Sequence, residues 1–312
     1  MVELRQRLGR LGLTTDEDPP ALFGPATRAA VEAFQHRRGL RVDGRCGTQT
    51  WATLLEAGYR LGDRALLRWT PMQRGDDVAE LQQRLGALGF DSGRVDGIFG
   101  DNTAAGVRDF QRNVGITADG IVGPATVGEL LRMRARHRRT ELVSSVRARE
   151  RLRNTPPTLV GRHVAVGEPG GLASALSAFR SALVEAGARV TAMHHPDDSI
   201  QAREANAGQA DLLVGLRLDP DVAGCATAYY AGYRTESEGG RRLAELIQAM
   251  VPVALEVADG GCRGMSVPLL RETRMPAVLV ELGPAGVIAD RSRLLALTLA
   301  AAVEAWAESA WE

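Results

Sequence analysis

Apolar residues in the first 130 positions follow a helical spacing that occurs twice. Leu4, Leu8 and Leu11 fall on one face of a helix, Val31 and Phe34 define a second face, and residues 48–57 form a third segment. The same order returns from residue 78 and ends at residues 124–133, with Asp-Gly turns between the segments. The repeat predicts two all-α domains of three helices each, at residues 1–60 and 70–133.

From residue 161 onward, short apolar runs alternate with longer amphipathic segments. The short runs predict strands at residues 163–166, 188–193, 212–218, 226–231 and 277–282. The longer segments predict helices at residues 172–186, 200–209 and 236–250, followed by a C-terminal helix. This alternation predicts an α/β domain over residues 161–312, with a mainly parallel sheet and helices on both of its faces.

The last predicted strand contains a single carboxylate, Glu281, within an apolar run. An unpaired carboxylate is costly to bury, so we expect Glu281 either at the open end of the strand or paired with a cation. The carboxyl ends of parallel strands are also where ligands and reacting groups gather in α/β proteins. Glu281 is therefore the first candidate site residue.

A basic linker at residues 134–160 separates the repeats from the α/β domain. Around it the chain carries Arg132, Arg134, Arg136, Arg138, Arg139, Arg147, Arg149, Arg151 and Arg153, and then Thr155, Pro156 and Pro157. We expect a solvated, partly helical segment that the prolines end. Binding to nucleic acid, to anionic lipid or to an acidic partner protein stays open as an alternative, although aromatic residues for base stacking do not interleave here.

Charge and composition narrow the function classes. The formal net charge is zero, which gives no electrostatic bias toward nucleic acid. The first residues lack the apolar core of a signal peptide, and no run reaches the roughly 20 apolar residues of a membrane-spanning helix. These features predict a cytoplasmic protein, or a secreted wall protein if the true start lies upstream. Cys46, Cys225 and Cys262 are odd in number and widely spaced, so we expect small buried side chains, not a disulfide framework.

The repeat resembles the peptidoglycan-binding domain that is often fused to cell-wall hydrolases. The second copy matches best, and the resemblance implies ligand contacts at Asp96, Gly97, Phe99, Asp119 and Gly120. The first copy departs from the pattern because residues 19–21, Pro-Pro-Ala, replace the Val-Asp-Gly turn at residues 95–97. A packing module that no longer binds ligand is the alternative interpretation.

Residues 161–312 resemble the zinc-dependent N-acetylmuramoyl-L-alanine amidases of the amidase_3 type. The resemblance rests on Arg203, Asn206, the paired tyrosines 229–230, the segment 269–271 and the run 276–283. It implies cleavage of the amide between the lactyl group of muramic acid and L-alanine. In such enzymes two histidines and one glutamate hold zinc, and another glutamate is the general base.

The zinc ligands that the resemblance implies are missing from this sequence. Pro169 stands where the first histidine belongs, and Arg217 stands where the last belongs. The loop that carries the ligand glutamate is absent, because a single helix with Glu185 at its far end separates residues 171 and 187. Only the general-base position survives, as Glu281, so we predict no metal site. An active zinc site needs three protein ligands.

We expect Arg217 and Glu281 to form an ion pair in the space that zinc would occupy. The predicted pocket contains these two residues with Glu168, Arg203 and Asn206. An alternative zinc set would combine Glu168 and Glu281 with one of His194 and His195, of which at most one can face the pocket because adjacent strand residues point to opposite faces.

The order of two repeats, a linker and an altered amidase domain resembles the CwlM-type pseudo-amidases of actinobacteria. That resemblance implies a cytoplasmic regulator of peptidoglycan precursor synthesis. The implied partners are peptidoglycan fragments or lipid-linked precursors and an enzyme of cytoplasmic wall synthesis. The alternatives are an active zinc amidase that hydrolyses the muramoyl-L-alanine bond, and a scaffold for protein contacts.

Overall fold

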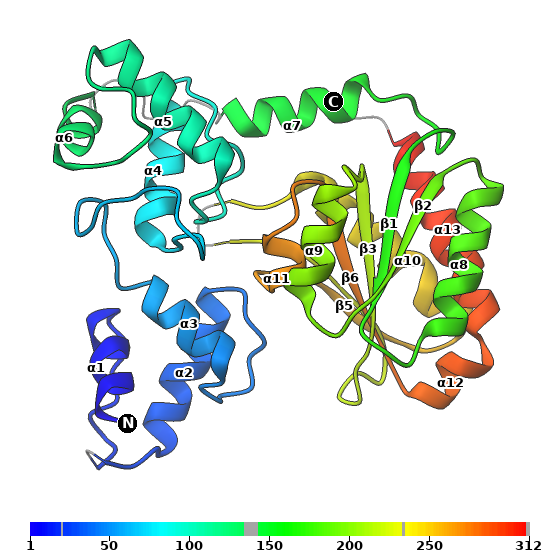
Figure 1. Ribbon diagram of the computed structural model, residues 1–312. Helices are drawn as coiled ribbons and strands as arrows, with labels where there is room; N and C mark the ends of the chain where they lie inside the picture. Colours follow the sequence, from blue (N-terminus) through cyan, green and yellow to red (C-terminus); the bar gives the residue numbers. More distant parts are fainter. Residues whose placement is uncertain (20, 134–142, 233–234, 310–312) are drawn as a thin grey trace. The chain divides into compact units, whose positions relative to one another are not determined.

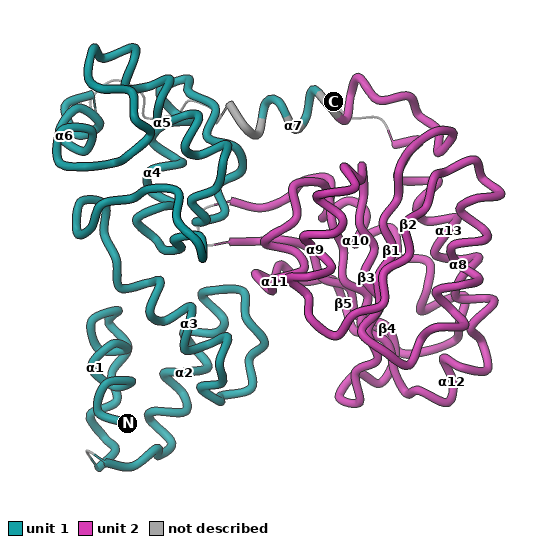
Figure 2. Tube along the Cα trace, in the orientation of Figure 1, with its two compact units in different colours: residues 1–151 teal, residues 152–312 magenta. Residues whose placement is uncertain are grey.

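Figure 1 shows a computed structural model of the protein, which describes residues 1–19, 21–133, 143–232 and 235–309. The chain forms two compact units, Met1–Arg151 and Leu152–Glu312 (Figure 2). Each unit is built around its own hydrophobic clusters, so each is described separately.

The first unit contains two three-helix repeats, as the periodicity predicts. The first repeat consists of α1 (Val2–Arg10), α2 (Pro25–Arg37) and α3 (Thr48–Glu56), and the second of α4 (Asp76–Ala87), α5 (Asp101–Val114) and α6 (Pro124–Arg132). Leu8, Val31 and Phe34 are fully or almost fully buried in the first repeat, at the spacing that predicts their helices. Proline at the first helical position begins α2 and α6, where a missing N–H costs no hydrogen bond.

A helix follows the repeats in the basic segment. Helix α7 (Val143–Asn154) ends immediately before the sequence Thr155, Pro156 and Pro157, because proline disfavours the helical conformation of the residue before it. The predicted linker arginines between residues 134 and 142 lie outside the described residues.

The second unit contains a six-stranded sheet with the order β2-β1-β3-β6-β4-β5. Its strands are β1 (His163–Glu168), β2 (Arg189–His194), β3 (Leu212–Leu218), β4 (Gly224–Tyr230), β5 (Ala258–Met265) and β6 (Ala277–Leu282). All pairings are parallel except that of β4 with β6. The fold class is thus confirmed, but β5 was not predicted because its sequence, ADGGCRGM, lacks the apolar alternation of a strand.

Helices cover both faces of this sheet (Figure 1). One face packs against α8 (Ala173–Glu185), α10 (Glu238–Leu255) and α13 (Ser292–Glu308), and the other packs against α9 (Asp198–Ala207) and the short α11 (Pro268–Arg271). Helix α12 (Ala285–Asp290) precedes α13. No helix in the described part of the chain combines the length and the apolar content needed to cross a membrane.

Alternation along each strand divides the side chains between the two faces. On β6, Val278 and Val280 belong to the core beneath α8, α10 and α13, whereas Ala277 and Leu279 belong to the core beneath α9 and α11. Glu281 therefore faces the α9/α11 side. This assignment decides which charged residues can meet.

Candidate functional site

Arg217 and Glu281 lie next to each other at the carboxyl ends of β3 and β6. They are register partners on adjacent parallel strands. Leu213 on β3 and Leu279 on β6, an even number of residues earlier in each strand, belong to the core beneath α9 and α11, so both charged side chains start from that face. Neighbouring strands are about 4.8 Å apart, so the two side chains start from adjacent positions. The predicted proximity of these two residues is thus present in the backbone.

Each of the two side chains nevertheless has an ion pair with a different residue. The Arg217 Nη2 atom donates to Oδ1 of Asp198, the first residue of α9, at 2.6 Å. The Glu281 Oε2 atom accepts from the guanidinium of Arg263 on β5. The predicted Arg217–Glu281 ion pair is therefore wrong, since α9 and β5 supply partners that the sequence did not place there.

Small side chains on β4 make the Arg263–Glu281 contact possible. Strand β4 lies between β6 and β5, with Ala226 opposite Glu281 and Ala228 opposite Arg263. The β4 positions opposite both residues thus carry only the small side chain of alanine. Glu281 is 1% exposed and the Arg263 side chain is 48% exposed, so the carboxylate is buried behind a cation that remains open to water.

Glu168 belongs to the opposite face of the sheet. Val164 and Val166 on β1 pack beneath α8 and α13, and alternation puts Glu168 on that side. Its Oε2 atom accepts hydrogen bonds from the backbone N–H groups of Gly170 at 2.8 Å and Leu172 at 3.1 Å, while Oε1 contacts Nδ1 of His194. Glu168 therefore holds the turn from β1 into α8.

Arg203 and Asn206 both lie on α9. Arg203 is exposed to solvent. The Asn206 side chain donates to the carbonyl of Glu272 at 2.8 Å and accepts from the N–H of Arg274 at 2.9 Å, which fixes the segment that leads into β6. That segment meets β6 at its amino end, about 13 Å along the strand from Glu281. Glu168 and Asn206 therefore do not join Arg217 and Glu281, and the predicted five-residue pocket is wrong in these two members.

The residues at the family's ligand positions do not fit a zinc ion. Pro169 has no donor atom, and Arg217 is a permanent cation. The alternative set also fails, because Glu168 and His194 meet on one face of the sheet while Glu281 lies on the other. Among the described residues, no three His, Cys, Asp or Glu side chains are grouped closely enough to hold a metal.

The predicted ligand residues of the second repeat form hydrogen bonds inside the repeat. The buried Gln82 side chain donates to Asp96 Oδ1 at 2.9 Å and to Thr103 Oγ1 at 3.0 Å. Its Oε1 atom accepts from the N–H groups of Asp96 at 3.1 Å and Gly97 at 2.9 Å. Gly97 has φ of 72°, which glycine adopts without strain. Asp96 and Gly97 therefore form a turn that Gln82 holds in place.

The same unit occurs again around Asp119 and Gly120. Gln111 donates to Asp119 Oδ1 at 2.9 Å and accepts from the Gly120 N–H at 2.8 Å. Hydrogen bonds from the Ile121 N–H and from Gln111 hold the pKa of Asp119 below its ordinary value. Phe99 is fully buried in the core of this repeat. These predicted ligand residues have clear structural roles.

Sequence reasoning missed Asp198 and Arg263. Asp198 lies two residues before the predicted helix 200–209, although it is the first residue of the observed α9. Arg263 lies in the glycine-rich segment that was not predicted as a strand. Neither residue matches a motif, so their meeting with Arg217 and Glu281 depends on the order of the strands and on the position of α9.

Comparison with known families agrees with the two parts of the fold. Residues 1–54 and 74–130 match the peptidoglycan binding domain, and residues 173–305 match N-acetylmuramoyl-L-alanine amidase. These matches define the class as a chain of two peptidoglycan-binding repeats and one amidase-type domain. The chain is also 33% identical to N-acetylmuramoyl-L-alanine amidase CwlM of Mycobacterium tuberculosis, over 91% of this chain and 79% of that protein. The chain belongs to this amidase family.

Shorter similarities cover the parts separately. A spore cortex-lytic enzyme of Halalkalibacterium halodurans is 46% identical over 56 residues, which are 18% of this chain and 17% of that enzyme. The crystal structure of the N-acetylmuramyl-L-alanine amidase Ami1 from Mycobacterium smegmatis aligns with 48% of this chain and 98% of its own, at 14% identity and a TM-score of 0.43.

Proposed function

We propose that this protein is a peptidoglycan-binding pseudo-amidase, which acts in wall synthesis by binding and not by hydrolysis. The observation that supports this most is a pair of cations, one at the carboxyl end of β3 and one on β5 in contact with Glu281. Arg217 occupies a position where the family would place a zinc ligand, and Arg263 pairs with the carboxylate at the general-base position, Glu281. A general base must reach the water that it activates, and this oxygen accepts from a guanidinium instead.

The ligands that we propose are peptidoglycan fragments or lipid-linked precursors. The peptidoglycan binding domain matches of both repeats support this choice. An enzyme of wall synthesis is the proposed protein partner, through which binding of a fragment would regulate precursor supply. The compartment expected for such a regulator is the cytoplasm, and cell fractionation with an antibody against this chain tests it.

Hydrolysis in excess zinc separates this proposal from an active zinc amidase. The purified full chain is incubated with peptidoglycan and zinc, and released peptide is measured by mass spectrometry. We expect no release from the wild-type chain or from Glu281→Gln, and far less than one zinc per chain by elemental analysis. Zinc-dependent release that Glu281→Gln abolishes would reject the pseudo-amidase.

Binding is tested by calorimetric titration of the full chain with muropeptides and with lipid-linked precursors. We expect saturable binding of at least one of them, without added zinc. A chain that neither binds nor hydrolyses any of these compounds would leave a protein scaffold as the better interpretation.

A further inference from the structure

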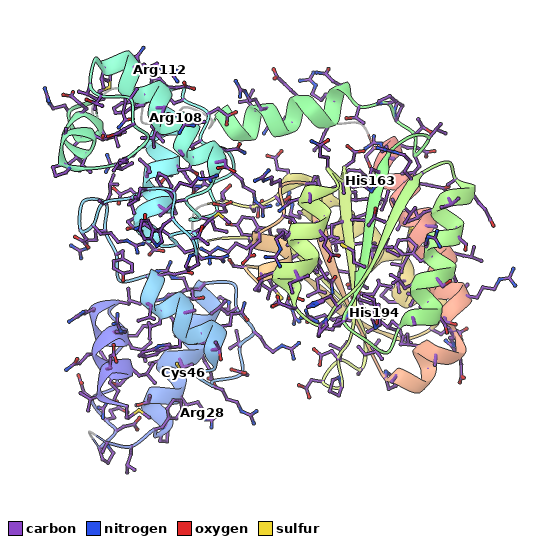
Figure 3. All side chains as sticks on the ribbon, in the orientation of Figure 1. Arg28, Cys46, Arg108, Arg112, His163 and His194 are labelled. Atoms are coloured by element: carbon purple, nitrogen blue, oxygen red, sulfur yellow. The ribbon has the colours of Figure 1, made fainter. Side chains whose placement is uncertain are left out.

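The first repeat contains a pocket of about 510 Å³ that the sequence pattern did not predict. Its walls combine apolar and cationic side chains from all three helices and from the turn before α3. The lining residues are Met1, Leu4, Phe23, Arg28, Gly44, Arg45, Cys46 and Trp51. Figure 3 labels Arg28 and Cys46 in this repeat.

The pocket lies where the first repeat departs from the second. Phe99 of the second repeat is 0% exposed, whereas its counterpart Phe23 is 36% exposed. Gln82 holds the turn before Phe99, but Arg5 occupies the corresponding place and donates to Thr15 Oγ1 at 2.9 Å and to the Pro19 carbonyl at 2.7 Å. The Asp-Gly turn is absent from this place in the first repeat, and Phe23 lines a pocket instead of filling the core.

Two cations at the pocket have no counterpart in the second repeat. By the alignment of the two copies, Arg28 corresponds to Ala104 and Arg45 to Ile121. Both arginines are exposed to solvent and line the pocket. The second repeat places a different arginine, Arg108, against its Gly120, so the cations at these two turns come from different positions of the repeat.

The backbone holds both arginines in place. The Arg45 carbonyl accepts from the buried Gln35 side chain at 3.0 Å, and its N–H donates to Asp43 at 2.8 Å. The Arg28 stem lies against Gly44, where an added Cβ would come within 2.9 Å of its Cγ. The carboxylate of Glu32 also lies against Gly44, but the lining of the pocket contains no carboxylate.

We propose that this pocket binds the peptide part of a wall fragment, a short peptide with free carboxylates and small aliphatic side chains. Two guanidinium groups match carboxylates by charge and geometry, and Leu4, Phe23 and Trp51 provide apolar contact for methyl groups. A plain N-acetylglucosamine chain has no carboxylate and does not satisfy the arginines. This inference rests on the proposed function, because it assigns the ligand to one repeat and to one part of the wall fragment.

Calorimetric titration of the full chain with two probes tests the ligand class. The probes are a synthetic stem tetrapeptide, L-Ala-γ-D-Glu-diaminopimelate-D-Ala, and N-acetylglucosamine tetramer. We expect the peptide to bind, with an affinity that falls as salt increases, and the tetramer not to bind. Equal binding of both probes would overturn the assignment to the peptide part.

Matched arginine variants test the place of binding. Arg28→Ala and Arg45→Ala are each expected to weaken peptide binding by about 10-fold or more, because each removes a charge-assisted hydrogen bond. Arg37→Ala is the control, since Arg37 is also exposed on α2 but does not line the pocket. Arg28→Gln separates loss of charge from loss of side-chain packing.

Cys46 supplies a local readout of where the peptide binds, at peptide concentrations that saturate the chain. Its thiol lines the pocket, so bound peptide should slow its alkylation in a Cys262→Ser background. Peptide binding that leaves Cys46 unprotected and Arg28→Ala unaffected would overturn this inference while the proposed function stands. Failure of peptides, muropeptides and lipid-linked precursors alike to bind would overturn both.

Discussion

Replacing Gln82 with leucine should loosen the second repeat. Leucine is close to glutamine in size but cannot form its hydrogen bonds. The Gly97 N–H loses its acceptor, the Asp96 N–H keeps only the Arg94 carbonyl at 3.1 Å, and the Ile98 carbonyl and Thr103 Oγ1 lose the Gln82 amide as a donor. Gln82 itself is only 1% exposed. Each buried group left without a partner costs about 1–3 kcal/mol, and water that enters the turn offsets part of this. We expect the repeat to lose about 3 kcal/mol of stability, on the order of a 100-fold change in its opening equilibrium.

Hydrogen exchange followed by mass spectrometry on the full chain measures this loss locally. Amides of residues 76–114 should exchange on the order of 100-fold faster than in the wild-type chain. Amides of the unit Leu152–Glu312 should not change, because that unit has its own core. The control is Gln49→Leu, at an exposed position of α3, which should leave exchange in its repeat unchanged within about threefold.

A change below about threefold in residues 76–114 would refute this reasoning. It would mean that Asp96 and Gly97 keep their turn without Gln82. The assignment of these two residues to a structural role would then lose its support, and a ligand role for them would return as the better interpretation.

Three further results are expected. The nearby Thr27 side chain and the N–H groups of Thr27 and Ala26, which donate to the Asp18 carboxylate, hold the pKa of Asp18 below its ordinary value. The stability that ionised Asp18 contributes is thus present above pH about 4 and is lost as the pH falls through the folded pKa. Asp18→Asn should remove this pH dependence, which hydrogen exchange of the α2 amides in an acid titration measures. Arg263→Met should lower the free energy of unfolding of the second unit by about 1–2 kcal/mol, measured by urea denaturation. This is less than the cost of breaking a fully buried ion pair, because the Arg263 side chain is half exposed. The double variant Arg263→Met with Glu281→Leu should recover most of the loss. Burial raises the pKa of the Cys225 thiol to about 12, so iodoacetamide at pH 8 should leave Cys225 unmodified until the chain unfolds, and modification in the native state would contradict its burial.

The second repeat shows that positions of a family motif can have a structural role. The resemblance to the peptidoglycan-binding domain marks Asp96, Gly97, Asp119 and Gly120, and in the structure a buried glutamine holds each of these two turns. Such positions are fixed by folding requirements. Arg28 lies outside the pattern, and only the comparison of the two copies marks it as different.

The sequence by itself determined the two helical repeats and the α/β order of the second unit. Hydrophobic spacing is a local property, because a helix or strand must bury one face or both whatever its neighbours are. The same local logic required that Glu281 be paired or lie at an open end.

The tertiary structure alone decided the partners of the charged residues. Strand order places β5 two positions from β6, and Ala226 between them lets Arg263 reach Glu281. The first turn of α9 brings Asp198 to Arg217 in the same way. Ion pairs between distant segments depend on how those segments pack, and the local sequence of each segment does not specify that packing.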